Sequence, residues 1–130
     1  MIAKVVAGSA LVLWHAAAIA QGIPAGTYRL TISPAGGDDP ACSYLRGAED
    51  VTVAEGSTVV RTTLYEALQI RLAADGRVTG SGVEKMTGWG APSTFEGKRV
   101  PGGYAGEGTG ERSGQYCYAT WTFEGPRPSR

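Results

Sequence analysis

The chain has 130 residues, with 12 Lys and Arg against 12 Asp and Glu, so its formal net charge is zero. This length accommodates one domain of ordinary size. Twenty residues are Gly, about twice the usual share of roughly 7%, yet 42% hydrophobic residues is a globular and not a disordered composition. A neutral chain lacks the basic surface that binds nucleic acid or anionic lipid, so neither partner is expected.

Residues 1–20 have the layout of a secretory signal peptide. Lys4 precedes an apolar run from Val5 to Trp14, and Ala18–Ala20 supplies the small side chains of a cleavage site, which makes Gln21 the first mature residue. The alternative is an uncleaved anchor, but the apolar run falls short of the roughly 20 residues that spanning requires. We therefore expect a periplasmic or secreted bacterial protein with no stable membrane insertion after processing.

The cysteines support the same compartment. Cys42 and Cys117 both lie in the mature region, and two Cys in an exported chain predict one disulfide. The alternative is two unpaired buried thiols. The single His, His15, lies in the signal segment, so the mature chain has no imidazole for a catalytic triad or a zinc site. We expect no metal, no cofactor and no catalytic residue.

Alternation of apolar and polar residues predicts strands along the mature chain. The two clearest are Gly26–Ser33 and Gln115–Gly125. Further strands are expected over 50–54, 58–64, 77–86, 93–100 and 104–111. Turn signals at short intervals predict an all-β domain over 21–125, a small antiparallel meander barrel or sandwich of seven to eight short strands. Residues 34–40 are expected to form a loop and 126–130 a mobile tail.

The stretch from Leu64 to Ala74 is ambiguous. Thr63-x-x-Glu66 fits a helix capping box, and leucines recur at helical spacing. Against a helix, the residues alternate up to Asp75-Gly76, a pair that typically forms a hairpin turn with positive φ at both positions. We favour the hairpin. Its sequence over Leu68–Gly80, Leu-x-Ile-x-Leu-x-x-Asp-Gly-x-Val-x-Gly, resembles hairpins of lipocalin- and avidin-like barrels. The resemblance implies a barrel fold, and it covers too little of the chain to carry over any ligand-binding residue.

Several glycines recur at strand spacing and therefore share one face of a strand. They are Gly80 and Gly82, and then Gly106, Gly108 and Gly110. The missing side chains predict that a large aromatic residue from a neighbouring strand, or a tight bend, fills the space. The alternative is a ligand lying against bare backbone.

Four aromatic residues are candidates for binding. Trp89 stands between two glycines and is either an anchor for a partner or a lid folded over a barrel end. Tyr116 and Tyr118 point outward from the last strand and are candidates for contact with a sugar or a partner, the alternative being a solvated surface. Tyr104, in phase with the glycines that follow it, is a further candidate.

Carboxylates are the remaining route to catalysis. The pairs Asp38-Asp39 and Glu49-Asp50 flank Cys42, and Glu107 and Glu111 lie on the polar side of a predicted strand. We expect these groups to be solvated; calcium binding near Asp38 is the alternative. The sequence thus predicts a non-enzymatic exported binding or accessory module of the bacterial envelope, with a small molecule, a glycan or an exported protein as partner. An inhibitor or interaction subunit is the alternative, and a small carboxylate-dependent hydrolase is less favoured.

Overall fold

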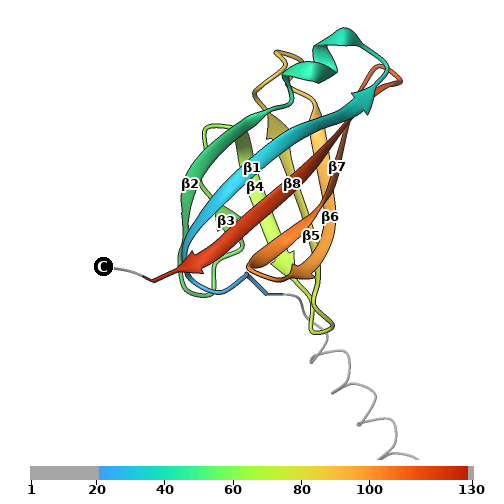
Figure 1. Cartoon of the computed structure of the whole chain (residues 1–130). Helices are drawn as coiled ribbons and strands as arrows, with labels where there is room; N and C mark the ends of the chain where they lie inside the picture. The colour runs from blue at the N-terminus through green and yellow to red at the C-terminus, as the bar shows by residue number, and fades with distance from the viewer. Residues whose placement is uncertain (1–20, 129–130) are drawn as a thin grey trace, which may run out of the picture.

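The computed structural model describes residues 21–128, so the expected signal peptide and the last two residues of the expected tail lie outside the described part. The described residues form eight antiparallel strands in one sheet that wraps into a nearly closed barrel (Figure 1). This confirms the all-β prediction. The strands are β1 (Gly26–Gly37), β2 (Gly47–Val53), β3 (Val59–Val60), β4 (Tyr65–Leu72), β5 (Arg77–Glu84), β6 (Pro92–Val100), β7 (Gly103–Arg112) and β8 (Gln115–Arg127), with a short 3-10 helix η1 (Pro40–Tyr44) between β1 and β2. Within 21–128, no helix has the length and apolar character needed to cross a membrane.

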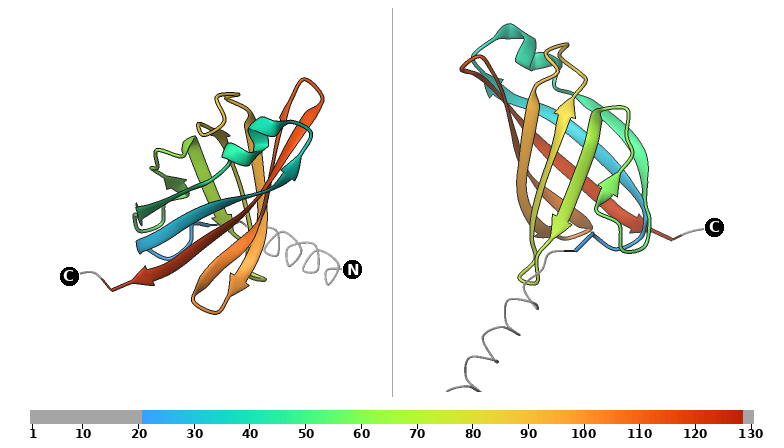
Figure 2. Two further views of the ribbon diagram at one scale, coloured as in Figure 1. Left: turned by 45° about the horizontal axis from the view of Figure 1, so that its top comes forward. Right: turned by 180° about the vertical axis from the view of Figure 1, so that it is seen from behind.

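The strands follow one another around the barrel as a meander. The sheet order is β2-β1-β8-β7-β6-β5-β4-β3, so the first strand pairs with the last and the opening falls between β2 and β3. At this seam Glu49 of β2 accepts hydrogen bonds from the side chains of Thr62 and Thr63, just beyond the two-residue strand β3. Both views of Figure 2 show the strands wrapped about a common axis. Side-chain hydrogen bonds therefore replace the backbone ladder at the seam between β2 and β3.

Aromatic side chains fill the inside of the barrel. Trp121, Phe95 and Phe123 pack edge to face, with the Phe95 and Trp121 rings 6.3 Å apart and the Trp121 and Phe123 rings 5.8 Å apart. Tyr28 and Tyr65 extend the cluster through edge contacts with Phe123 and Phe95. Burying a large apolar side chain contributes about 1.5–3 kcal/mol, so this cluster is the main source of stability.

The glycine faces are filled in part as the first interpretation predicts. Gly97 and Gly106 lie opposite each other on β6 and β7, and Trp121 lies opposite Gly106 on β8. A Cβ on Gly97 would stand 2.6 Å from Cζ2 of Trp121, and one on Gly108 would stand 3.2 Å from the Phe95 ring. Among the glycines named from the sequence, an aromatic ring fills the space at Gly108, whereas Gly106 lies against the backbone of β6 and Gly82 against Leu68, so the prediction is confirmed only in part.

The 64–74 stretch is a strand, which confirms the hairpin, but its turn differs from the prediction. Only Gly76 has a positive φ (90°), while the carboxylate of Asp75 accepts from the Arg77 amide. The turn with positive φ at both positions joins β7 to β8 at Ser113 and Gly114 (52° and 81°). Ala67 (φ 54°) sits in a bulge of β4, where the pairing register with β5 shifts. Because of this bulge, the stretch combines leucines at helical spacing with the alternation of a strand.

Three expected boundaries are wrong. β1 continues to Gly37 through the predicted 34–40 loop, because glycines at 36 and 37 adopt φ values of 105° and 153° and a register shift follows Pro34. The expected 58–64 strand shrinks to Val59–Val60. The tail does not begin at 126, since β8 runs to Arg127, which pairs with Thr27.

Cys42 and Cys117 form the predicted disulfide, with 5.2 Å between their Cα atoms and a sequence separation of 75. The bond joins η1 to β8 at one end of the barrel. It thus connects the segment between β1 and β2 to the final hairpin.

Replacing both cysteines by Ala should lower the free energy of unfolding by about 4 kcal/mol, because the unfolded chain regains the entropy of a long loop. Urea unfolding of the native and variant chains measures the loss. A difference below about 1 kcal/mol would contradict a stabilising role for this bridge.

Gly106→Ala should destabilise the barrel by about 3 kcal/mol, because the new Cβ would stand 1.9 Å from the carbonyl oxygen of Glu96. Gly82→Ala is the control, since its nearest contacts, Cα and Cδ1 of Leu68, lie 3.3 Å away and need give far less than the carbonyl of Glu96, so it should cost less. Thermal unfolding of both variants compares them, and equal melting temperatures would refute the close approach of β6 and β7.

Candidate functional site

Two exposed tyrosines stand side by side on the outer surface of β8. The side chains of Tyr116 and Tyr118 are 39% and 43% exposed, and Tyr44 of η1, at 66%, is a further exposed tyrosine near this end of the barrel. Their rings are parallel within 9°, with centroids 6.4 Å apart. The alternation of β8 places Cys117 between them on the inner face, so both rings point to solvent.

The backbone beneath these rings is held firmly. The Tyr116 amide donates to Oδ2 of Asp38 (2.9 Å), and the Asp38 amide donates to the Tyr116 carbonyl (2.8 Å). The disulfide anchors the next residue, Cys117. Binding to such a pair costs little ordering entropy, because the segment that carries it is already fixed.

A hollow of about 650 Å³ lies on the outer surface of β5, β6 and β7. Its rim carries outward-pointing threonines and two glutamates from the three strands: Thr79, Thr94, Glu96, Glu107 and Thr109. Register joins the hollow to the tyrosines, since Thr94 pairs with Thr109 and Thr109 with Tyr118. We call the outward residues Thr79, Thr94, Glu96, Glu107, Thr109, Tyr116 and Tyr118 the β5–β8 face.

The wall of these strands contains several glycines: Gly80 lines the hollow itself, and Gly97 and Gly106 line an adjoining one. Gly97 and Gly106 have no side chain to hold β6 and β7 away from the core, so the wall approaches Trp121 closely. The indole Nε1 of Trp121 donates to the carbonyl of Glu107 at 3.0 Å and fixes β7 at that point. The packing of the core therefore shapes the outer surface.

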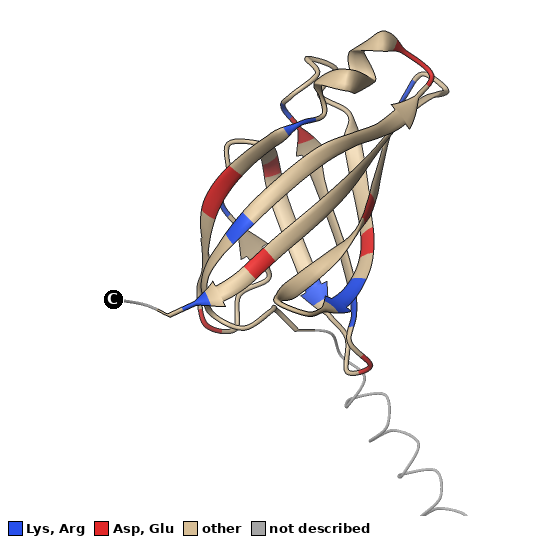
Figure 3. Ribbon diagram, in the orientation of Figure 1, with Lys and Arg blue, Asp and Glu red and all other residues tan. Residues whose placement is uncertain are grey.

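The two carboxylates on the rim of the hollow face each other. Glu96 and Glu107 are directly opposite in the β6–β7 ladder, an arrangement that repulsion between like charges disfavours. Neither forms an ion pair within residues 21–128. Arg77 and Lys98 border an adjoining hollow of about 430 Å³ that shares both glutamates. Figure 3 shows charges of both signs distributed over the barrel.

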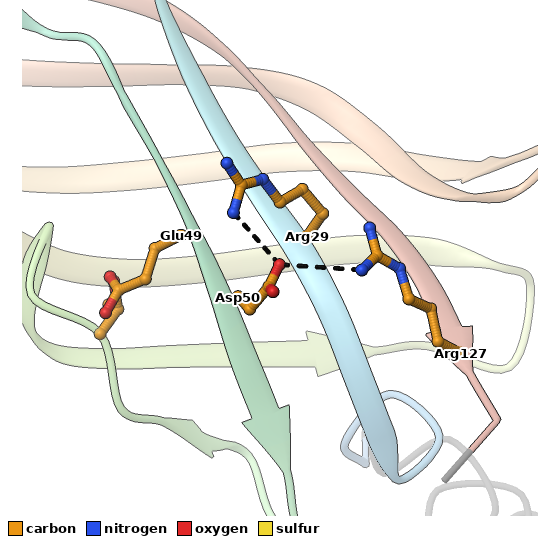
Figure 4. A network of polar contacts seen from close by, with 5 residues as sticks. Arg29, Glu49, Asp50 and Arg127 are labelled. Carbon is orange, nitrogen blue, oxygen red and sulfur yellow. Dashed lines mark hydrogen bonds and ion pairs between the residues drawn. The ribbon is translucent and has the colours of Figure 1, made fainter. Parts of the chain in front are cut away.

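The carboxylates that flank Cys42 have structural partners. Asp39 accepts from the Ala41 amide and caps η1. Asp50 pairs with Arg29 at 3.2 Å and Arg127 at 3.9 Å, which links β2, β1 and β8 (Figure 4). Burial raises the pKa of Glu49, but hydrogen bonds from Thr62 and Thr63 outweigh this effect and lower the pKa overall. Exposed ion pairs such as those of Asp50 with Arg29 and Arg127 contribute little free energy of folding and mainly hold the strand register.

Trp89 closes one end of the barrel. Its ring packs against the core cluster, and the guanidinium of Arg112 lies 5.8 Å from its centroid. Glu84 is only 2% exposed and fixes the loop that carries Trp89. Its carboxylate accepts hydrogen bonds from the amides of Met86 and Thr87 and from the Thr87 hydroxyl. Burial raises the pKa of Glu84, yet these hydrogen bonds lower it below the ordinary value. The lid interpretation of Trp89 fits this packing better than the anchor interpretation.

Tyr104 does not belong to the site. Its side chain is 4% exposed and packs inside the barrel with its ring 6.4 Å from that of Tyr28. The in-phase glycines that suggested a binding role place it on the inner face of β7. Tyr104 is therefore a core residue outside the β5–β8 face, and its role in binding stays a prediction.

Sequence reasoning missed the threonines and Glu96. Each lies at an outward position of a predicted strand, but nothing in the sequence shows which strands become neighbours. Only the β6–β7 register brings Glu96 opposite Glu107. Outward Thr and Glu residues on consecutive strands were the available signal, and it is a weak one.

No protein-family model, characterised protein sequence or solved structure matches this chain. Among residues 21–128, no group of three or more His, Cys, Asp or Glu side chains is arranged to hold a metal ion. The β5–β8 face is an open, polar, partly aromatic surface on a rigid wall, which can hold a ligand through stacking and hydrogen bonds.

Glu84→Gln should lower the free energy of unfolding by about 2 kcal/mol at neutral pH, because hydrogen bonds to a charged acceptor weaken. The folded pKa of Glu84 lies below 4.5, so its contribution is present above that pH and is lost as the pH falls through the folded value. Melting temperatures measured from pH 7 to pH 3 should therefore fall less steeply for the variant. Parallel curves would contradict this role of Glu84.

Proposed function

We propose that this chain is a non-enzymatic exported binding module that holds its ligand on the β5–β8 face. The observation that carries the proposal is the continuity between the hollow and the parallel tyrosines, which a regular ladder joins through Thr109 and Tyr118. The disulfide supports an extracytoplasmic location, where such bonds form and persist.

The packing inside the barrel favours an outer site over an inner one. Eight-stranded barrels can enclose one small ligand when their interiors are open. Here the interior contains a cluster of edge-packed rings built around Trp121, and Trp89 covers one end. A ligand therefore gains more contact on the outer face.

The alternatives are less well supported. A carboxylate-dependent hydrolase needs an acid kept protonated in an apolar, sheltered environment, whereas Glu96 and Glu107 are exposed among threonines. An inhibitor or interaction subunit would dock through a surface whose centre is depleted in charge. The centre of this face instead carries two glutamates.

The double substitution Tyr116→Ser/Tyr118→Ser tests the proposal. The purified chain is immobilised and exposed separately to peptidoglycan, to soluble envelope glycans, to lipid vesicles and to the exported protein fraction. We expect the native chain to retain a glycan probe and the double variant to lose about nine-tenths of that retention, a change of about 1.4 kcal/mol.

Val59→Ser is the matched control, because Val59 is 51% exposed on β3 and lies outside the β5–β8 face. It should bind as the native chain does. Equal retention by the native chain and the double variant, or no retention of any probe, would overturn the proposal. Retention of a protein alone would favour the docking alternative.

A further inference from the structure

We propose that the β5–β8 face binds an oligosaccharide that carries no acidic groups. This inference rests on the proposed function and names the chemical class of its ligand. Sugar rings would stack on Tyr118 and Tyr116, and their hydroxyl groups would donate to Glu107 and Glu96.

The tyrosine pair matches the two-sided character of a sugar ring. A pyranose has an apolar face of C–H groups and an edge of hydroxyls. The Tyr116 and Tyr118 rings offer parallel apolar surfaces, each with a hydroxyl at its tip that hydrogen-bonds at the edge. A lipid chain or an apolar peptide would need a continuous apolar patch, and the neighbours of this pair on β7 are Glu111 and Thr109.

The polar residues match the hydroxyl groups. An ionised carboxylate only accepts hydrogen bonds, and a threonine hydroxyl both donates and accepts. Glu96 and Glu107 face each other across β6 and β7 without a cation in ion-pair contact within 21–128. Hydroxyl donors from a ligand would offset their repulsion, because hydrogen bonds to a charged acceptor are about twice as strong as neutral ones.

Charge decides between classes of saccharide. Glu111, opposite Tyr116 in the ladder, adds a third carboxylate beside the stacking surface. Arg77 and Lys98 border Glu96 and Glu107 only on the side away from the tyrosines. On the tyrosine side, uronic acids and sulfated sugars would place like charges against the carboxylates, which costs binding energy in a partly desolvated contact. Neutral or amine-bearing saccharides avoid this cost.

The dimensions suit a short chain laid across the strands. From β5 to β8 there are three interstrand steps, which correspond to about 14 Å at the usual spacing of roughly 4.8 Å. A saccharide in this direction would contact the tyrosines at one end and Thr79 of β5 at the other. The hollow between them, about 650 Å³, has room for the central rings.

Isothermal titration calorimetry with the purified chain tests the inference. The probes are tetrasaccharides of N-acetylglucosamine, glucosamine, β-linked glucose and galacturonic acid. We expect at least one of the first three to bind, and galacturonic acid to bind at least about tenfold more weakly than it. Tyr118→Ala and Glu107→Gln should each weaken binding about tenfold, whereas Tyr118→Trp should preserve it because an aromatic plane remains.

Glu124→Gln is the matched control for charge, because Glu124 is an exposed carboxylate of β8 that does not line the hollow. It should bind within about twofold of the native chain. Thermal unfolding confirms that each variant is folded before its affinity is compared.

Two results would overturn the inference: galacturonic acid binding as tightly as the other tetrasaccharides, or Tyr118→Ala binding as the native chain does. Other results distinguish failure of this inference from failure of the proposed function. If no tetrasaccharide binds while the double tyrosine variant still loses retention of lipid vesicles, the face is a binding site and its saccharide specificity is wrong. If the double variant retains every probe, both proposals fail.

Discussion

The indole of Trp121 occupies the inner space that Gly97 leaves on β6, and Trp121 itself is paired with Gly106 of β7. Its Nε1 donates to the carbonyl of Glu107, so one side chain packs the core and also fixes the wall that carries the outer carboxylate. Protein interiors are close-packed and deform little, and the hollow outside this wall is therefore a consequence of the packing inside it. The polar face and the aromatic core therefore lie on opposite sides of the same strands.

A second set of constraints holds the end of the barrel where the tyrosines stand. The disulfide joins η1 to β8, and Asp38 exchanges two hydrogen bonds with the backbone of Tyr116. Gly37 approaches this point so closely that a Cβ would stand 2.3 Å from Sγ of Cys42. Rigid support of this kind is what a binding surface needs to avoid a loss of entropy when a ligand arrives.

The sequence-based predictions succeeded where local patterning was strong. Alternation along 26–33 and 115–125 identified the two longest strands, and glycine spacing indicated a face that the Phe95 ring fills at Gly108. They decided less where a residue's role depends on distant neighbours. Tyr104 lies on the same face of its strand as the glycines, whether that face packs inside or binds a ligand. Only its contact with Tyr28 shows that it belongs to the core. The Asp75-Gly76 turn was located correctly, but its dihedral angles were not, because the carboxylate of Asp75 stabilises a different turn.

By itself, the sequence determined the strand content, the single disulfide and the outward direction of Tyr116 and Tyr118, because alternation and cysteine count are local or unambiguous properties. Only the tertiary structure decided that the sheet wraps as a barrel, that its seam lies between β2 and β3, and that Glu96 stands opposite Glu107. The physical reason is register: a shift of one residue between strands would turn these side chains to the other face. Register depends on the turn geometry and on which face of each strand is buried, and only the assembled barrel shows both.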